Sequence, residues 1–268
     1  MAGNCASRHT LPMCLVTLAW NCHPRWRLAM AGNRDEFHAR PTAPLAHWPP
    51  PQETVIAGRD LRSGGSWMGV NNRGQAAVLT NVRDPTAAAG GPSRGELVAG
   101  YLAGSDDADR YIDALAGQAH RFAPFNLLVA DAEHCCYLGN HPALYQRLPP
   151  GIHGMSNGTL DAPWPKTRRL MQALESWLQQ PAGDFDDLWP ALADESRPAD
   201  DDLPHTGIAL ELERRLSSTF IRGDEYGTRA STLVAIDHQG QGFIHERRFG
   251  PEGAFLGETR IGIRREQK

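Results

Sequence analysis

The residue best placed to act as a nucleophile is Cys14, which follows Met13 and begins an apolar run over residues 14–20. If translation starts at Met13 and that methionine is removed, one residue carries both a thiol nucleophile and a free α-amine that can act as its base. The pattern therefore predicts an N-terminal nucleophile at Cys14. Residues 1–13 show no periodic apolar pattern and are interpreted as a tail. While this tail stays attached, the amine is an amide and the mechanism is lost.

Cys14 also has a structural interpretation, because an unpaired cysteine in a strand packs as a small apolar residue. The segments Cys22-His23 and His134-Cys135-Cys136 contain metal-ligand types. Neighbours on a strand point to opposite faces, however, and the chain contains no CxxC or HExxH pattern. The sequence therefore predicts no metal site.

Composition and charge argue against several classes of function. The 268 residues carry a net charge of −4, which gives no electrostatic drive toward nucleic acid or an acidic membrane. No apolar run approaches the ~20 residues needed to cross a bilayer, and the polar start of the chain does not resemble a secretory signal. Five irregularly spaced cysteines argue against a disulfide framework. We therefore expect a cytoplasmic protein without a nucleic-acid partner or a transmembrane segment.

Strands are predicted where apolar residues run together or alternate between turn residues. The turn signal Asn72-Arg73-Gly74 joins two such segments into a hairpin. The predicted strands cover residues 14–20, 27–32, 66–71, 75–80, 125–130, 134–138, 144–147, 232–237 and 242–246. The stretch 33–65, rich in Pro, Gly and Arg, is predicted to form a long ordered loop.

Helices are predicted in the middle of the chain. A capping box, Ser93-Arg-Gly-Glu96, opens one helix toward Leu102, and two more are predicted at 106–118 and 165–180. Residues 181–207 are interpreted as an excursion with one short helix. Strands, then helices, then strands indicate an α+β fold, predicted as a single domain over residues 14–268.

Six short motifs follow one another along the chain, and the resemblance that they carry extends over nearly all of the sequence after Met13. They are Asn33-Arg-Asp-Glu36, Gly58-Arg-Asp60, Gly64-Gly-Ser-Trp-Met-Gly69, Leu79-Thr-Asn-Val-Arg83, Ser93-Arg-Gly95 and Tyr226-Gly-Thr-Arg229-Ala-Ser-Thr232. This series resembles the NRDE family, which includes the transport and Golgi organisation 2 proteins.

The resemblance implies a fold similar to N-terminal-nucleophile (Ntn) hydrolases, especially the choloylglycine hydrolase and penicillin V acylase group. The implied architecture is an α+β four-layer αββα sandwich. By this resemblance the catalytic residues are Cys14, Arg34, Asp35, Asn81, Asn157 and Arg222. The residues expected to bind ligand are Glu36, Arg59, Trp67, Arg83 and Arg229.

Each position implied to be catalytic has a task that its chemistry allows. Arg34 and Arg222 would favour the thiolate, and Asp35 would orient the α-amine. That amine, with a reference pKa of about 7.7–8.0, suits proton transfer at neutral pH. The side-chain amide of Asn81 would donate to a tetrahedral oxyanion, and Asn157 would position the amine or the substrate carbonyl. The alternatives are a loop-fixing ion pair between the arginine and aspartate of the motif, and turn roles for the two asparagines.

The resemblance implies two classes of function, each with a small-molecule or acyl ligand. The first is a cysteine Ntn hydrolase or acyltransferase that acts on a linear amide or thioester and requires no cofactor. The alternative is a non-catalytic carrier or chaperone on the same fold, with haem or an acyl lipid as its transported ligand. Eukaryotic members of the resembled family are implicated in haem trafficking and in lipid or acyl-CoA homeostasis. On the carrier hypothesis, the arginines would meet the carboxylates or phosphates of the ligand.

Overall fold

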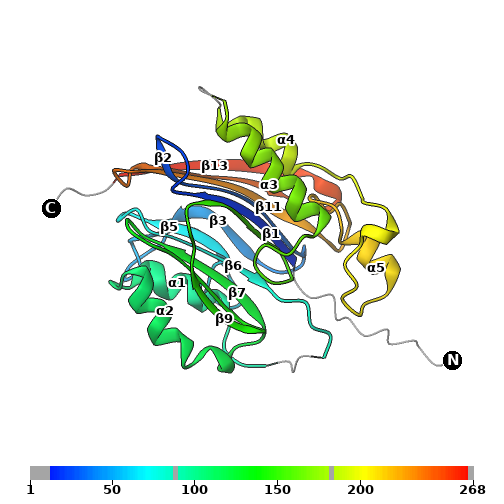
Figure 1. Cartoon of the computed structure of the whole chain (residues 1–268), viewed down its shortest axis with the longest axis horizontal. Helices are drawn as coiled ribbons and strands as arrows, with labels where there is room; N and C mark the ends of the chain where they lie inside the picture. The colour runs from blue at the N-terminus through cyan, green and yellow to red at the C-terminus, as the bar shows by residue number, and fades with distance from the viewer. Residues whose placement is uncertain (1–12, 87–89, 181–183, 265–268) are drawn as a thin grey trace.

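Two β-sheets lie face to face, and helices cover the outer face of each sheet (Figure 1). The computed structural model describes residues 13–86, 90–180 and 184–264. The four layers confirm the predicted αββα sandwich. The predicted tail, apart from Met13, and the last four residues of the predicted domain lie outside the described residues.

The first sheet is antiparallel, and its central strands place the N-terminal and C-terminal parts of the described chain side by side. Its strands are, in spatial order, β10 (Gly151–Met155), β1 (Met13–Trp20), β2 (Trp26–Phe37), β11 (Tyr226–Asp237), β12 (Gly242–Phe249) and β13 (Phe255–Ile263). In this sheet β2 pairs with β1 on one side and with β11 on the other. The segment with the Asn33–Glu36 motif is therefore held between the strand that starts at Met13 and a strand from the C-terminal part.

The second sheet is a meander in which each strand pairs with its neighbours along the chain. Its strands are β3 (Thr42–His47), β4 (Val55–Asp60), β5 (Met68–Asn71), β6 (Ala76–Asn81), β7 (Phe125–Ala130), β8 (Cys135–Asn140) and β9 (Ala143–Arg147). The edge strand β3 contains Pro44 and changes register between Ala43 and Ala46. Such positions tolerate proline because the edge of a sheet does not need its N–H.

The helices form the two outer layers. Against the second sheet pack α1 (Gly95–Ala103) and α2 (Ala108–Ala116), and against the first sheet packs α3 (Pro165–Leu178). The remaining helical segments are α4 (Trp189–Leu192), α5 (Leu210–Arg215) and the 3-10 turns η1 (Ala119–Arg121), η2 (Phe185–Leu188), η3 (Asp200–Asp202) and η4 (Pro251–Gly253). Figure 1 shows α3 and α4 above one sheet and α1 and α2 below the other.

Strand β1 is buried on both faces, which fixes where its side chains point. Val16 and Leu18 belong to the apolar cluster between the two sheets, whereas Leu15 and Ala19 belong to the cluster under α3. Since side chains alternate along a strand, Cys14 faces the space between the sheets and Met13 faces the helical layer. Met13 is itself fully buried, so it is a core residue and not part of a tail.

The predicted elements differ from the structure in identifiable places. The predicted loop 33–65 contains the second half of β2 and all of β3 and β4. Besides β3 and β4, the strands β10 and β13 and the helix α5 were not predicted. The capping box was wrong, because α1 begins at Gly95 with Arg94 at its N-cap and without a side-chain cap hydrogen bond. The predicted helices 106–118 and 165–180 correspond to α2 and α3.

Candidate functional site

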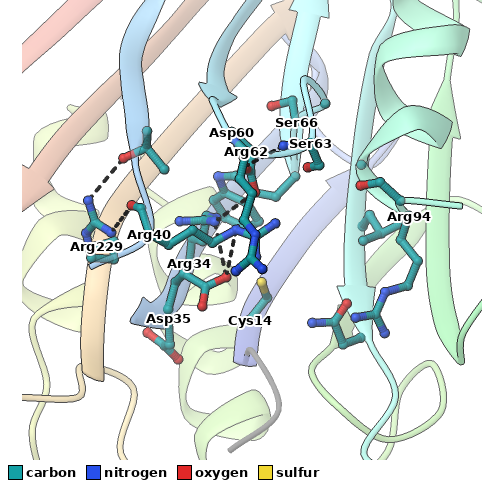
Figure 2. Close-up of a pocket in the computed structure, with 18 of the residues that line it drawn as sticks. Cys14, Arg34, Asp35, Arg40, Asp60, Arg62, Ser63, Ser66, Arg94 and Arg229 are labelled. Atoms are coloured by element: carbon teal, nitrogen blue, oxygen red, sulfur yellow. Dashed lines mark hydrogen bonds and ion pairs between the residues drawn. The ribbon is translucent and has the colours of Figure 1, made fainter. Parts of the chain in front are cut away.

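A cavity of about 1400 Å³ opens between the ends of the two sheets, and Cys14 lies in its wall (Figure 2). Its walls come from β1 and β2, from the β4–β5 loop, from the segment that leads into α1, and from β11 and β12. Cys14 reaches it as the second residue of β1, with 5% of its surface exposed. Arg94 lies across the cavity from it. The volume exceeds the ~300–1,000 Å³ of most small-molecule pockets, so a sizeable ligand fits.

The Cys14 thiol is protonated at neutral pH while Met13 precedes it. Burial raises the pKa of this thiol to about 12, an effect that the Arg34 guanidinium offsets only in part. The charges of Asp35 and Glu36 raise it further, and the backbone N–H of Asp35 donates to the sulfur and lowers it. The site as described therefore holds a masked nucleophile and not a thiolate.

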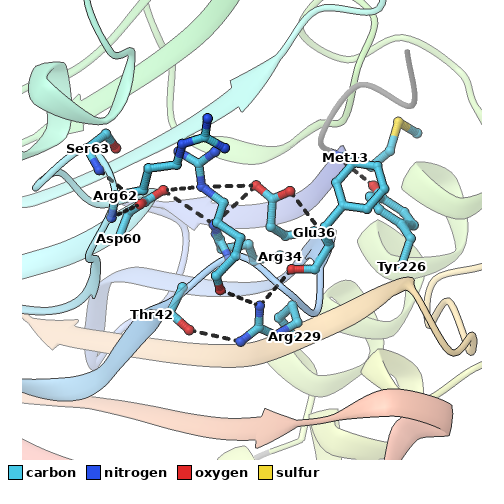
Figure 3. Close-up of polar contacts among 11 residues, drawn as sticks. Met13, Arg34, Glu36, Thr42, Asp60, Arg62, Ser63, Tyr226 and Arg229 are labelled. Carbon is cyan, nitrogen blue, oxygen red and sulfur yellow. Dashed lines mark hydrogen bonds and ion pairs between the residues drawn. The ribbon is translucent and has the colours of Figure 1, made fainter. Parts of the chain in front are cut away.

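Arg34 belongs to a network of charges on the cavity wall (Figure 3). Its Nη2 lies 3.4 Å from Glu36 and 3.8 Å from Asp60. Arg40 joins the same two carboxylates, with its Nε 2.6 Å from Asp60 and 3.6 Å from Glu36. Because Glu36 lies on β2 and Asp60 ends β4, the network ties the two sheets together beside the thiol. This is one form of the structural ion pair left open by the sequence, although its partners are Glu36 and Asp60 and not Asp35.

The carboxylate of Asp35 lies on the other side of the sheet from the thiol (Figure 2). It is fully buried, and its Oδ1 accepts a hydrogen bond of 2.7 Å from Thr228. Its Oδ2 has no hydrogen-bond partner among the described residues. Burial raises the pKa of this carboxyl to about 6, even though Lys166 and the Thr228 hydrogen bond lower it. Asp35 is thus a buried carboxylate with one unused oxygen near the start of β1.

The two predicted asparagines are brought together, but only one reaches the cavity. Asn81, at the end of β6, lines it. The Asn157 side chain donates to the backbone carbonyl of Asn81 at 2.7 Å, and the Arg83 backbone N–H donates to the Asn157 carbonyl at 2.7 Å. The neighbouring Ser156 hydroxyl donates to the Cys14 carbonyl at 2.8 Å. Asn157 and Ser156 therefore brace the strands that carry Cys14 and Asn81.

Arg222 is not brought to the cavity. Its side chain is half-exposed and pairs with Glu195, with 2.6 Å between Nη2 and Oε1. Arg83 is also absent from the cavity wall: it is buried, with its Nη1 2.5 Å from Glu213 and its Nη2 3.2 Å from the Met13 sulfur. Sequence reasoning grouped both arginines with the site because of their motifs, but their positive charges are used elsewhere.

Four of the predicted ligand-binding residues do line the cavity. They are Glu36, Arg59, Trp67 and Arg229. Arg229 lies where the β11–β2 register shifts, and it donates to the carbonyls of Phe37 and Arg40 at 2.8 and 2.9 Å. A register shift of this kind, as in a β-bulge, re-aims a side chain, which explains how Arg229 faces the cavity. Arg59 stacks on Trp48, with 4.3 Å between its Cζ and the ring centroid, and donates to the Gly64 carbonyl.

Two buried polar residues near Cys14, Lys166 and Tyr226, were not among the predicted site residues, although Tyr226 begins the last of the six motifs. Lys166, in the first turn of α3, donates from Nζ to the Leu216 carbonyl at 3.0 Å. Tyr226 accepts a hydrogen bond of 2.9 Å from the backbone nitrogen of Met13 (Figure 3). A signal for the first was present, because the chain contains only two lysines, Lys166 and Lys268, among its 27 lysines and arginines.

The fold and the placement of Cys14 define a protein of the Ntn-hydrolase fold class. A solved structure of the C2A mutant of conjugated bile acid hydrolase from Clostridium perfringens superposes with a TM-score of 0.52, covering 92% of each chain at 8% identity. A Caenorhabditis elegans N-acylethanolamine-hydrolysing acid amidase ortholog gives a TM-score of 0.50, covering 82% of this chain and 91% of that one at 11% identity. At such identities the likeness shows the fold alone.

Sequence comparison then gives the family. The sequence profile of the transport and Golgi organisation 2 family matches residues 13–251. A Bos taurus homolog of that protein is 30% identical over 262 residues, covering 88% of this chain and 92% of its own length. The Homo sapiens homolog is 29% identical over 275 residues, covering 92% and 97%. The chain belongs to the transport and Golgi organisation 2 family.

Two features are absent from the described residues. No helix in residues 13–86, 90–180 and 184–264 has both the length and the apolar character to cross a membrane. Within the same ranges, no group of three or more His, Cys, Asp or Glu side chains could hold a metal ion.

Proposed function

We propose that this protein is a cysteine Ntn hydrolase or acyltransferase that acts on a linear amide or thioester once Cys14 is the first residue of the chain. The observation that carries the proposal is the position of the Cys14 thiol. It lies at the head of a central strand and in the wall of a cavity of about 1400 Å³, in a fold of the Ntn-hydrolase class. A thiol in a large cavity has both the nucleophile and the room that acyl transfer needs.

The reaction would proceed in two steps. The α-amine takes the proton of the thiol, and the sulfur attacks the acyl carbonyl to form a tetrahedral oxyanion. Asn81, in the cavity wall, is the candidate donor to that oxyanion. The amine then returns the proton to the departing amine or thiol, which leaves an acyl thioester on Cys14. Water, or an acceptor nucleophile, releases the acyl group in the second step.

Arg34 supports this chemistry because its positive charge favours the thiolate form of Cys14. Its guanidinium is the charge that lowers the Cys14 thiol pKa most, although Glu36 and Asp60 share its charge. The predicted help from Arg222 has no basis in its position, since that side chain pairs with Glu195. Removal of Met13 would replace a buried peptide bond with an amine, and this change is what would turn the protonated thiol into a nucleophile.

The test compares two forms of the same protein. One form begins at Cys14, released from a cleavable fusion, and the other retains Met13. Each is incubated with a panel of fatty-acyl amides and acyl thioesters, and intact mass spectrometry follows acyl transfer to the protein while chromatography follows product. We expect turnover and a Cys14-linked acyl adduct only in the form that begins at Cys14.

Matched variants identify the nucleophile. Cys14→Ser should abolish the adduct, whereas Cys22→Ser, at an exposed thiol, should leave it unchanged. Equal turnover in both forms, or an adduct that survives Cys14→Ser, would contradict the proposed mechanism. Circular dichroism and thermal melting of each form show whether the fold is retained.

A second function is favoured by the same thiol in its described state. A thiol whose pKa is raised by burial to about 12 does not act as a nucleophile at neutral pH. The cavity wall nevertheless carries Arg59, Arg62 and Arg94, for which no carboxylate of the described residues lies within ion-pair distance. With the tail retained, the protein would act as a carrier of an anionic acyl lipid or haem. Binding by the full chain that is unchanged in Cys14→Ser and weakened in Arg94→Met would support the carrier.

A further inference from the structure

Behind Cys14, on the helix-facing side of the first sheet, lies a buried polar cluster that the two-step reaction does not use. Met13 is enclosed there, with its backbone N–H donating to the Tyr226 hydroxyl at 2.9 Å. In the β1–β2 ladder Met13 pairs with Asp35, and Cys14 pairs with Arg34. The backbone nitrogen of Cys14, which becomes the α-amine when Met13 is removed, is therefore one residue from this cluster.

Asp35 supplies the first half of the inference. Its side chain is fully buried, and its Oδ2 lacks a hydrogen-bond partner among the described residues. A buried carboxylate oxygen without a donor is costly, so a structure that keeps one calls for an explanation. A newly formed α-ammonium on the adjacent strand would supply the missing donor.

Lys166 supplies the second half. Lys166 is 2% exposed, and the Leu216 carbonyl accepts a hydrogen bond from one of the three N–H groups of its ammonium. It is one of only two lysines in a chain with 27 lysines and arginines. The chain thus uses arginine at nearly all of its basic positions, and the lysine at this buried position is an exception. A lysine can lose its proton near neutral pH when buried, whereas an arginine cannot.

We propose that Lys166 is a positioning residue for the α-amine of Cys14: its buried charge keeps Asp35 as the carboxylate that binds the amine and disfavours a second proton-bearing cation beside it. This inference rests on the proposed function, because it needs a chain that begins at Cys14. Lys166 touches neither thiol nor substrate and acts through Asp35 and the amine. The charged and titratable groups around it are Asp35 on β2, Cys14 on β1, Arg83 after β6 and Glu213 on α5.

The direction of each titration agrees with this role. Burial lowers the pKa of Lys166 to about 8, against the opposing effect of Asp35. Burial raises the pKa of Asp35 to about 6, and Lys166 is the charge that lowers it most. Between these two values both groups are ionised. Loss of the ammonium would let Asp35 take up a proton at a higher pH, and an uncharged Asp35 holds an ammonium poorly.

The experiment uses the small number of lysines. In protein labelled with [ε-13C]lysine the two lysine signals can be titrated separately, and Lys166→Met assigns them. In the form that begins at Cys14, [15N]cysteine labelling reports the titration of the α-amine. Forming the free amine should lower the Lys166 pKa, because two buried cations disfavour each other. By reciprocity, protonating either group must affect the other equally.

The variants separate an electrostatic role from a packing role. Lys166→Met should raise the α-amine pKa by about one pH unit, because the ammonium loses a second buried cation beside it, and Lys166→Arg, which keeps the charge, should restore it. An α-amine pKa that is the same in wild type and Lys166→Met overturns the inference. Should Lys166→Met not fold, a Lys166 pKa in the wild type that ignores formation of the amine overturns it equally.

The two proposals fail in different ways. If Cys14-dependent acyl transfer is absent but Lys166 and the amine titrate together, the proposed function falls and the electrostatic coupling remains. If acyl transfer occurs while the titrations are independent, the function stands and Lys166 is only a packing residue. Neither outcome requires the natural substrate to be known.

Discussion

The masked state of Cys14 leads to a quantitative prediction for the full chain. Burial raises its thiol pKa to about 12, and the thiolate is the form that reacts with alkylating agents. We therefore expect the rate of Cys14 alkylation in the chain that retains Met13 to rise about tenfold for each pH unit from 6 to 10, without a plateau. The sign follows from the raised pKa, because every pH in this range lies below it.

The expected size of the effect can be worked out from that value. At pH 8 a thiol whose pKa is about 12 is ionised to a fraction of about 10⁻⁴. An ordinary thiol with a pKa of about 8.5 is roughly one quarter ionised at the same pH. The thiolate fractions therefore differ by a factor of about 2,000, to which the low exposure of Cys14 adds a further reduction.

The assay is iodoacetamide labelling, quantified on the Cys14 peptide by mass spectrometry across the pH range. Cys22 in the same chain is exposed and reports the reagent and the pH. Cys14→Ser confirms the peptide assignment. A Cys14 rate that levels off below pH 9, or one that equals the Cys22 rate at pH 8, would refute the argument from burial.

Three further predictions concern the surroundings of the site. Glu213→Ala leaves a buried arginine unpaired and should lower the free energy of unfolding by about 3–5 kcal/mol in urea titrations, whereas Glu211→Ala, on the exposed face of the same helix, should change it by less than about 0.5 kcal/mol. Gly65→Ala would place a Cβ 2.4 Å from the carbonyl carbon of Gly95 and should lower the free energy of unfolding by about 1–3 kcal/mol. A Cβ at Gly117 would meet nothing within 4 Å, so Gly117→Ala should be neutral or slightly stabilising. Equal losses of stability in the two variants would contradict the steric argument. Arg222→Ala should leave the pH dependence of Cys14 alkylation unchanged, since its guanidinium binds a surface glutamate, and a shifted profile would place it back in the site.

The sequence predicted the parts of the fold whose apolar residues mark them clearly. Strand β1 and helix α3 follow their apolar patterns to within two residues at each end. Strands β3 and β13 were missed because few of their residues are buried, so that polar residues, Gly and Pro dominate them. The stretch 33–65 looked like a loop because it is rich in Pro, Gly and Arg, although parts of β2 and β4 within it are buried. An ordered strand at a sheet edge needs no apolar pattern when its neighbour supplies the hydrogen bonds.

Motifs in the sequence identify candidate site residues, but they do not identify the partners that those side chains bind. Arg222 and Arg83 carry the same charge as Arg34, and only their ion-pair partners distinguish them. The partners of the two arginines outside the cavity are distant in the sequence: Glu213 is 130 residues from Arg83, and Glu195 is 27 residues from Arg222. Lys166 was missed because its importance depends on burial beside Asp35, which the local sequence around α3 does not reveal.

The Asn33–Glu36 motif serves two layers of the fold at once, because it lies on a strand. Arg34 and Glu36 face the cavity and meet each other there, on the side of the Cys14 thiol. Asn33 faces the helical layer, where its side chain donates to the carbonyls of Leu192 and Thr219 at 2.8 Å each. Alternation along the strand puts the Asp35 carboxylate on that same helical side.

This division explains how an acidic residue of the motif could assist a thiol that it does not face. The side chain of Cys14 points into the cavity, but its backbone nitrogen lies in the plane of the sheet, between the two faces. A carboxylate behind the sheet can therefore reach the nucleophile only through that nitrogen. For as long as the nitrogen is an amide, the Asp35 carboxylate has no charged group to bind on Cys14. Removing the peptide bond would give the unused oxygen of Asp35 a charged group to bind, and it would give the Cys14 thiol, whose pKa is raised by burial, a neighbouring base.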